Sequence, residues 1–145
     1  MSKQALGRFD HIGIAVHNID KARIFFEESL GARFRYLKED PQGFRFAVFD
    51  LDGFTIELLD PIDPEGFIAK FLHKHGEGVH HITLQTPDLE AQVDRLEKQG
   101  VRVVDKHLNN PEFIDAFISP RSGYGVLFQL GQTAPPLNNQ PHWEK

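Results

Sequence analysis

The sequence predicts an α+β fold built from two copies of one βαβββ unit, with eight strands and the helices on the outside. An alternating segment at 9–16 (FDHIGIAV) is matched by a second one at 79–86 (VHHITLQT). Each segment precedes a helical stretch that begins after a polar residue and ends at a glycine, Gly31 or Gly100. Three strand-like runs follow each helical stretch. One unit alone would leave a sheet face uncovered, so the copies need each other or a second chain.

The strand-like runs are separated by turn residues, among which Asp52-Gly53 is a hairpin signal. A short amphipathic helix around Phe67–His73 lies between the two copies. The expected strands are 33–38, 44–50 and 54–59 in the first copy, and 101–106, 113–119 and 125–130 in the second. We expect a single domain that contains a first module at about 8–60, a linker helix at about 61–77, a second module at about 78–131 and a polar tail at 132–145.

The composition excludes several kinds of protein and of site. Forty per cent hydrophobic and 26% charged residues are typical of a soluble globular domain. No apolar run is long enough to span a bilayer and the N-terminus lacks the apolar core of a signal peptide, so we expect a cytoplasmic protein. The absence of cysteine excludes disulfides, thiolate metal sites and cysteine nucleophiles. A net charge of −5 argues against a nucleic-acid partner.

Strand alternation places four polar side chains in the same phase. The isoleucines of the first strand should pack under the helix, which turns His11 to the opposite face. The same alternation turns Glu57, His81 and Gln129 away from their apolar neighbours. The four residues stand on the first and last strand of each copy. Pseudo-twofold symmetry would bring them to one cavity.

Two imidazoles, one carboxylate and one amide oxygen suit a divalent metal ion such as Co, Ni, Zn, Mn or Fe(II). Such a site leaves one or two positions for water or substrate. Any one of these residues alone is commonly a hydrogen-bonded polar group of the core, but four at symmetric positions favour a metal centre. His80 has the opposite phase and is expected to be a core histidine.

Weaker candidates could complete a substrate site around the metal. Thr83 shares the phase of the second-copy histidine, and Phe46 and Phe117 could form an apolar wall. Arg45 and Arg121 could hold an anionic group of the substrate, with solvation at the surface as the alternative.

The segments that carry these residues resemble the vicinal oxygen chelate (glyoxalase/bleomycin resistance/dioxygenase) superfamily, and most closely its methylmalonyl-CoA epimerase branch. The resemblance covers most of the chain and rests on the runs 10–16 (DHIGIAV), 56–61 (IELLDP), 68–72 (IAKFL), 76–82 (GEGVHHI) and 125–130 (GVLFQL). It implies a paired βαβββ fold with a cup-shaped mixed sheet around the metal, and a homodimer.

The ligand positions of this family fall on His11, Glu57, His81 and Gln129. Relatives usually carry glutamate at the position of Gln129, and in the epimerases that glutamate also transfers a proton, which a neutral amide cannot do. Segment 107–113 (HLNNPEF) has no glycine where the epimerases have a glycine-rich run along the acyl-CoA. These departures concern the substrate rather than the fold or the metal.

The sequence thus predicts a divalent-metal-dependent isomerase acting beside a carbonyl, and methylmalonyl-CoA epimerase in particular. The metal would stabilise the enediolate left by the departing α-proton, with Glu57 as the catalytic base and a small carbonyl or acyl-thioester compound as substrate. The alternatives are a glyoxalase I (lactoylglutathione lyase)-like enzyme, an Fe(II) ring-cleavage-type dioxygenase and a non-catalytic ligand-binding or resistance protein.

Overall fold

The computed structural model describes residues 5–135, 137 and 140–144. It divides into two compact units, the N-terminal unit (His11–His80) and the C-terminal unit (Met1–Asp10 with His81–Lys145). The strands β1 (Arg8–Ala15) and β5 (Gly78–Gln85) each contribute residues to both units. The eight strands of the described residues follow the order β2-β3-β4-β1 and β5-β8-β7-β6.

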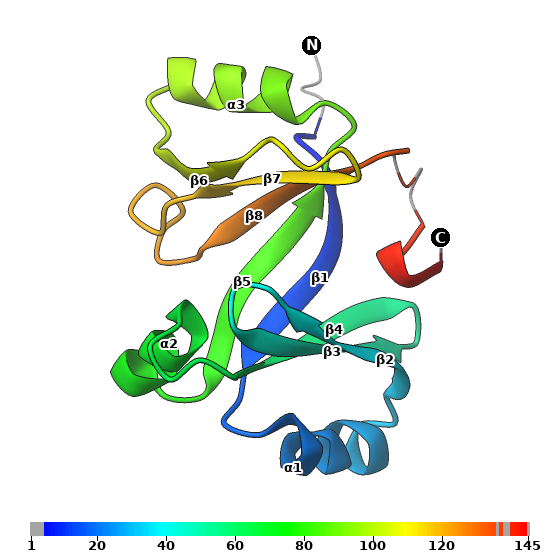
Figure 1. The fold of residues 1–145 in the computed structure, drawn as a ribbon. Helices are drawn as coiled ribbons and strands as arrows, with labels where there is room; N and C mark the ends of the chain where they lie inside the picture. The colour runs from blue at the N-terminus through cyan, green and yellow to red at the C-terminus, as the bar shows by residue number, and fades with distance from the viewer. Residues whose placement is uncertain (1–4, 136, 138–139, 145) are drawn as a thin grey trace. The chain divides into compact units, whose positions relative to one another are not determined.

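The N-terminal unit has a mixed sheet (Figure 1). β1 pairs in parallel with β4, whereas β2, β3 and β4 form an antiparallel meander. The elements that follow β1 are α1 (Ile19–Ile24), a π-helical turn (Phe25–Ser29), β2 (Arg33–Asp40), β3 (Phe44–Leu51), β4 (Phe54–Pro61) and α2 (Phe67–His75).

Local signals in the sequence explain where these elements begin and end. The Asn18 side chain accepts a hydrogen bond from the Lys21 N–H and so caps α1. The predicted first helix ends in a π-helical turn, in which the Leu30 N–H donates to the Phe25 carbonyl at 3.2 Å. Asp52 and Gly53 have φ of 50° and 89°, the left-handed conformation that the tight hairpin between β3 and β4 requires.

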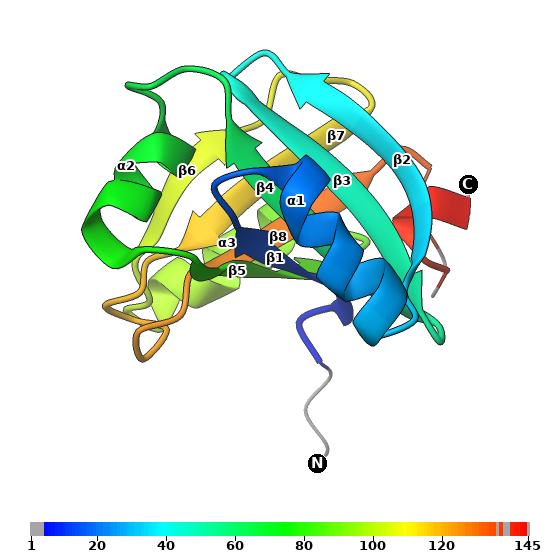
Figure 2. The same cartoon turned by 90° about the horizontal axis from the view of Figure 1, so that it is seen from below.

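The helix α1 covers one face of the N-terminal sheet (Figures 1 and 2). Burial of this apolar layer is the main stabilising contribution to the unit. The layer contains Val16, Ile19, Ala22 and Phe26 from the helical side and Ile12, Ile14, Ala47, Phe49, Ile56 and Leu58 from the strands. Side chains that alternate with these strand residues therefore lie on the face away from α1.

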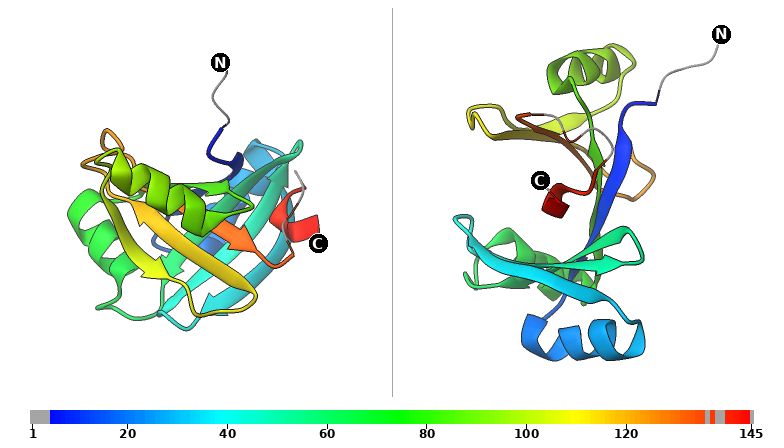
Figure 3. Two further views of the ribbon diagram at one scale, coloured as in Figure 1. Left: turned by 90° about the horizontal axis from the view of Figure 1, so that it is seen from above. Right: turned by 90° about the vertical axis from the view of Figure 1, so that its right-hand side faces the viewer.

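The C-terminal unit repeats this arrangement. β5 pairs in parallel with β8, and β6, β7 and β8 pair antiparallel. Its further elements are α3 (Leu89–Lys98), β6 (Val103–His107), β7 (Phe113–Ile118), β8 (Phe128–Thr133) and a 3₁₀ turn (His142–Glu144). Figure 3 shows α3 against one face of its strands. Asp88 caps α3 by accepting from the Ala91 N–H at 3.1 Å.

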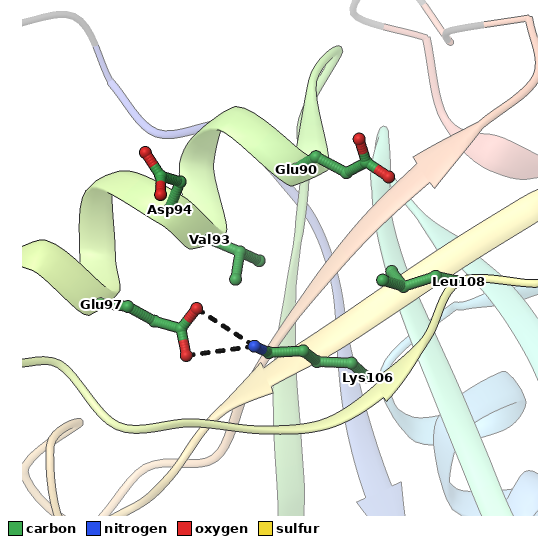
Figure 4. Close-up of a pocket in the computed structure, with 6 residues that line it drawn as sticks. All are labelled: Glu90, Val93, Asp94, Glu97, Lys106 and Leu108. Atoms are coloured by element: carbon green, nitrogen blue, oxygen red, sulfur yellow. Dashed lines mark hydrogen bonds and ion pairs between the residues drawn. The ribbon is translucent and has the colours of Figure 1, made fainter.

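The helix α3 buries Leu89, Val93 and Leu96 against the strands of this unit, where Ala116 and Leu130 are fully buried. A shallow hollow of about 180 Å³ lies between α3 and β6. Across it the Lys106 ammonium contacts both carboxylate oxygens of Glu97 at 3.1 Å (Figure 4). Lys106 therefore points to the helix side of the sheet.

The last strand begins later than the sequence predicts. We expected it at 125–130, but Tyr124 and Gly125 have φ of 57° and 89° and form a turn. The Gly125 N–H donates to the Pro120 carbonyl within this turn, and β8 starts at Phe128. β8 instead continues to Thr133, inside the segment expected to be a polar tail. The alternation of residues 128–130 is nevertheless the predicted one.

The repeated βαβββ order and the mixed strand pairing confirm the predicted fold class. None of the helices in the described ranges is both long and apolar enough to span a membrane.

Candidate active site

The N-terminal unit brings His11 and Glu57 together on the sheet face away from α1. They lie on the parallel neighbours β1 and β4, in a register that aligns His11 with Thr55 and Gly13 with Glu57. Their side chains are 8% and 13% exposed, and His11 Nε2 lies 3.4 Å from Glu57 Oε2. An imidazole nitrogen and a carboxylate oxygen, both nearly buried, thus converge on one point.

Apolar side chains continue this face of the sheet beside Glu57. Val48 of β3 is the direct cross-strand neighbour of Glu57, and Phe46 lies two residues along in the same phase. The Phe46 ring contacts both Tyr36 and Phe44, with centroids 6.2 Å apart in each case. Phe46 therefore lies on the same face of the sheet as Glu57.

Arg45 lies in the opposite phase and has a structural partner. Its Nε and Nη2 atoms donate to the two carboxylate oxygens of Asp60 at 2.9 and 2.6 Å. The same carboxylate accepts the backbone N–H of Ile19, the first residue of α1, at 2.8 Å. The hydrogen bond with Asp60 raises the pKa of Arg45 further above its ordinary value. The Asp60 carboxylate thus holds both the Arg45 guanidinium and the first N–H of α1.

The C-terminal unit places Thr83 and Gln129 side by side on β5 and β8. Their Cα atoms are partners in the parallel register, and the Thr83 hydroxyl donates to Gln129 Oε1 at 2.7 Å. His81 lies two residues before Thr83 on the same strand, in the same phase, and is 6% exposed. Each unit therefore carries one histidine and one further polar side chain in equivalent strands.

Two residues that the sequence analysis did not single out extend this polar group. Gln129 Nε2 donates to Asp115 Oδ2 at 2.8 Å, and Asp115 Oδ1 lies 2.7 Å from His107 Nδ1. Asp115 is the one acid in the apolar strand β7 and has the phase of Phe117, the cross-strand partner of Gln129. That alternation is a signal that could have identified Asp115.

A β-bulge explains why the sequence did not identify His107. Val104 pairs with Phe117, and His107 pairs with Asp115, whereas a regular antiparallel ladder would place Lys106 opposite Asp115. Asp105 has a φ of 50° within the bulge. The extra residue turns His107 to the face of Gln129. No alternation pattern could show this.

The remaining candidates lie at the border of this face. The Phe117 ring contacts the His107 ring edge-on at 6.4 Å between centroids. Arg121 lies in the turn after β7, where it is exposed and its backbone N–H donates to Ser119 Oγ.

Comparison with known proteins gives consistent results. A family model described as Glyoxalase/Bleomycin resistance protein/Dioxygenase superfamily matches residues 10–116. The chain is 37% identical over 129 residues to the uncharacterized protein YqjC of Bacillus subtilis, covering 86% of this chain and 91% of that protein. It is 35% identical over 135 residues to the ethylmalonyl-CoA/methylmalonyl-CoA epimerase of Cereibacter sphaeroides, covering 88% of this chain and 98% of the relative.

A solved structure extends the similarity to the fold. The crystal structure of methylmalonyl-CoA epimerase from Mycobacterium tuberculosis superposes with a TM-score of 0.81 at 34% identity, covering 93% of this chain and 94% of the other. These similarities indicate an epimerase or isomerase, which confirms the class of enzyme predicted from the sequence. Since the family model matches most of the described chain and the relatives align over nearly their whole length, the chain belongs to the glyoxalase/bleomycin resistance protein/dioxygenase superfamily.

Proposed function

We propose that the chain is a divalent-metal-dependent epimerase acting on the carbon next to the thioester carbonyl of an acyl-CoA, with methylmalonyl-CoA as the first substrate to test. The names of the epimerase relatives support the substrate class. The observation that carries the proposal is the nearly buried pair of His11 and Glu57. A nearly buried imidazole and carboxylate that converge on one point are groups that can bind a metal ion or a proton.

The donor atoms fit a metal ion. Two atoms bound to one ion at about 2.1 Å, with bond angles between the octahedral and tetrahedral values, lie about 3.0 to 3.4 Å apart. The 3.4 Å between His11 Nε2 and Glu57 Oε2 satisfies this condition. We propose His81 and Gln129 as the other two ligands because they occupy the equivalent strands of the second unit. The ion could be Co, Ni, Zn, Mn or Fe.

The hydrogen bonds of Gln129 suit a ligand role. Because the Asp115 carboxylate can only accept, the amide NH₂ of Gln129 must face it, and Oε1 faces Thr83. The amide oxygen keeps a second lone pair for a metal ion. When bound, the ion would supply a Lewis acid that stabilises negative charge on the substrate's carbonyl oxygen.

Side chains of the protein would take up the substrate's α-proton and limit the access of water to the site. Glu57 has two carboxylate oxygens, so one can bind the ion while the other takes the α-proton. Val48 and the Phe46 ring beside it keep this face apolar, which strengthens the electrostatic interactions of the carboxylate. Gln129 cannot exchange a proton, so the second proton transfer of an epimerisation requires another group.

Metal content and turnover test this proposal together. We expect the purified protein to hold about one equivalent of a divalent ion per chain and to epimerise methylmalonyl-CoA. His81→Ala should lose the ion, whereas His73→Ala, a change at an exposed histidine of α2, should keep it. Glu57→Gln should abolish turnover, and the exposed-site control Glu39→Gln should not.

The same purified protein can be used to test the three alternative functions, a glyoxalase I-like lyase, a dioxygenase and a non-catalytic ligand-binding protein. Methylglyoxal with glutathione tests the lyase, and oxygen consumption with Fe(II) tests the dioxygenase. Turnover in either assay and none with methylmalonyl-CoA would overturn the epimerase proposal. Saturable binding without turnover would indicate the ligand-binding alternative. A homodimer and a cytoplasmic location remain predictions.

A further inference from the structure

The strand β7 carries one carboxylate, Asp115, on the sheet face of the C-terminal unit that also carries Gln129. Its direct cross-strand neighbour on β8, Gly131, has no side chain and leaves the diagonal approach to Gln129 open. Gln129 Nε2 donates to Asp115 Oδ2 at 2.8 Å, and the Asp115 side chain is 12% exposed. A nearly buried acid thus holds the amide that we propose as a metal ligand.

The Gln129 amide has one orientation that suits both of its neighbours. Oε1 accepts the Thr83 hydroxyl at 2.7 Å, while Nε2 donates to Asp115. A half-turn of the amide would bring Oε1 against the carboxylate, with no hydrogen between the two acceptors. A hydroxyl both donates and accepts, so Thr83 fits either orientation. Asp115 is therefore the neighbour that selects the orientation of the amide.

Asp115 also brings negative charge to a neutral ligand. Within the described ranges its side-chain partners are the Gln129 amide and the His107 ring, whose Nδ1 lies 2.7 Å from Asp115 Oδ1, and neither partner is a lysine or an arginine. A carboxylate that accepts from an amide NH₂ polarises the amide and increases the negative charge on the amide oxygen. An acid in this position strengthens a metal ligand that it does not replace.

The N-terminal unit has the converse arrangement at the equivalent positions. Glu57 on β4 corresponds to Gln129 on β8, and their equivalent diagonal neighbours are Phe46 on β3 and Asp115 on β7. The charged ligand candidate therefore has an aromatic neighbour, and the neutral ligand candidate has an acid. Each unit has one carboxylate in this pair of positions, on the ligand in one unit and one hydrogen bond away from it in the other.

We propose that Asp115 is a positioning residue of the metal site, which selects the orientation of the Gln129 amide and strengthens its oxygen as a ligand. This assignment rests on the metal site proposed above and explains how a neutral side chain contributes to binding a cation. Both Asp115 oxygens already have polar partners, so the carboxylate acts through Gln129 rather than as a ligand itself.

The first test measures the dissociation constant of Co(II) for the metal-free, full-length protein by titration calorimetry. Asp115→Ala should weaken binding about 10- to 100-fold, as the loss of an outer partner of a metal ligand commonly does. Asp115→Asn should have a smaller effect, because an amide oxygen still accepts from Gln129 but carries no charge. His107→Ala, which leaves the contact with Gln129 in place, and the exposed-site control Asp105→Asn should bind Co(II) as wild type does.

The visible spectrum of the Co(II)-loaded protein separates positioning from a purely structural role, because it reports the ligands and geometry of the ion. At saturating Co(II), Gln129→Ala should change the spectrum through the loss of one ligand. Asp115→Ala should change it in the same direction, since the amide is then free to turn, and His107→Ala should not change it. A wild-type spectrum for either Gln129→Ala or Asp115→Ala would overturn the assignment.

The unfolding of the metal-free protein tests the contact itself. Gln129→Glu would place two carboxylates at hydrogen-bond distance and should lower the urea midpoint. Adding Asp115→Asn to this variant should raise the midpoint again, because the new amide donates to the new carboxylate. In the wild-type background Asp115→Asn should not raise it. Additive effects of the two changes would show that the side chains do not interact, and would overturn the assignment.

The outcomes keep the two proposals apart. If wild type binds none of Co, Ni, Zn, Mn and Fe(II), the proposed metal site fails and this assignment fails with it. If wild type binds Co(II) and a folded Asp115→Ala binds it equally tightly, the assignment of Asp115 alone fails and the metal site stands. If circular dichroism shows that Asp115→Ala does not fold, Asp115→Asn, which keeps the shape of the side chain, decides. An unchanged dissociation constant in that variant would then overturn the assignment.

Discussion

His11 Nε2 lies 3.4 Å from Glu57 Oε2, although the two residues belong to the first and the last strand of their module along the chain. Parallel pairing of β1 with β4 makes this contact possible, because it aligns the first and last strands in register. The equivalent strands of the other unit carry His81 and Gln129. Three of the four proposed ligands are therefore neutral. A divalent ion with a single carboxylate would keep net positive charge and act as an effective Lewis acid.

Removal of the metal should destabilise the protein. A ligand that binds only the folded state stabilises it by about 2.7 kcal/mol when present at 100 times its dissociation constant. We expect dialysis against a chelator to lower the urea midpoint, and re-addition of the native ion to restore it. His81→Ala should abolish this response, and His73→Ala should retain it. Identical midpoints with and without the ion would contradict the metal site.

Substitution of Asp60 should destabilise the N-terminal unit without touching the site. The Asp60 side chain is 4% exposed and holds both Arg45 and the N–H of Ile19. Asp60→Ala leaves the partly buried Arg45 guanidinium and the Ile19 N–H without this acceptor, at a cost of about 2 to 3 kcal/mol by chemical denaturation. Asp94→Ala, which breaks an exposed pair with Lys98, should cost less than about 0.5 kcal/mol. Equal effects of the two changes would show that Asp60 is not structural.

Much of the fold and of the site could be predicted from alternation. The phase of the isoleucines and leucines assigned the helix-facing side, and the same alternation placed Glu57 beside His11. Polar residues at Asn18 and Asp88 cap the two helices at the predicted positions. These signals are local, because each depends on residues within a few positions along the chain.

What could not be predicted depends on non-local contacts and on backbone irregularity. Alternation shows that Arg45 has the opposite phase to Phe46, but it cannot show that the partner of Arg45 is an acid on the neighbouring strand. His107 changes face because of a bulge, and the sequence around Asp105 carries no glycine to announce a positive φ. The late start of β8 likewise follows from a positive φ at a residue other than glycine, Tyr124, which the sequence does not indicate.

The stability of the metal-free protein should fall between pH 6.5 and 4 because of His80. Its ring packs against Phe67 and Phe71, with centroids 5.7 and 4.9 Å away, and burial lowers its pKa to about 4. The unfolded chain then binds a proton in this range that the folded chain does not, so the contribution of His80 is complete above pH 6.5 and decreases as the pH falls. The slope should be at most about 1.4 kcal/mol per pH unit.

His80→Leu should reduce this slope in urea titrations at pH 7, 6 and 5, and His73→Leu, at an exposed position, should not. An unchanged slope in His80→Leu would show that other groups account for the acid sensitivity.

The bulge itself can be tested through Asp105, whose side chain is exposed and whose φ of 50° is the feature that matters. Asp105→Gly should be neutral or slightly stabilising, because glycine adopts this conformation without strain. Asp105→Val should cost about 1 to 2 kcal/mol, since a β-branched residue is strongly disfavoured there. If the strand relieves that strain by returning to a regular ladder, Lys106 replaces His107 opposite Asp115. Urea titrations of both variants check these values, and equal free energies of unfolding for Asp105→Val and Asp105→Gly would contradict a strained backbone at Asp105.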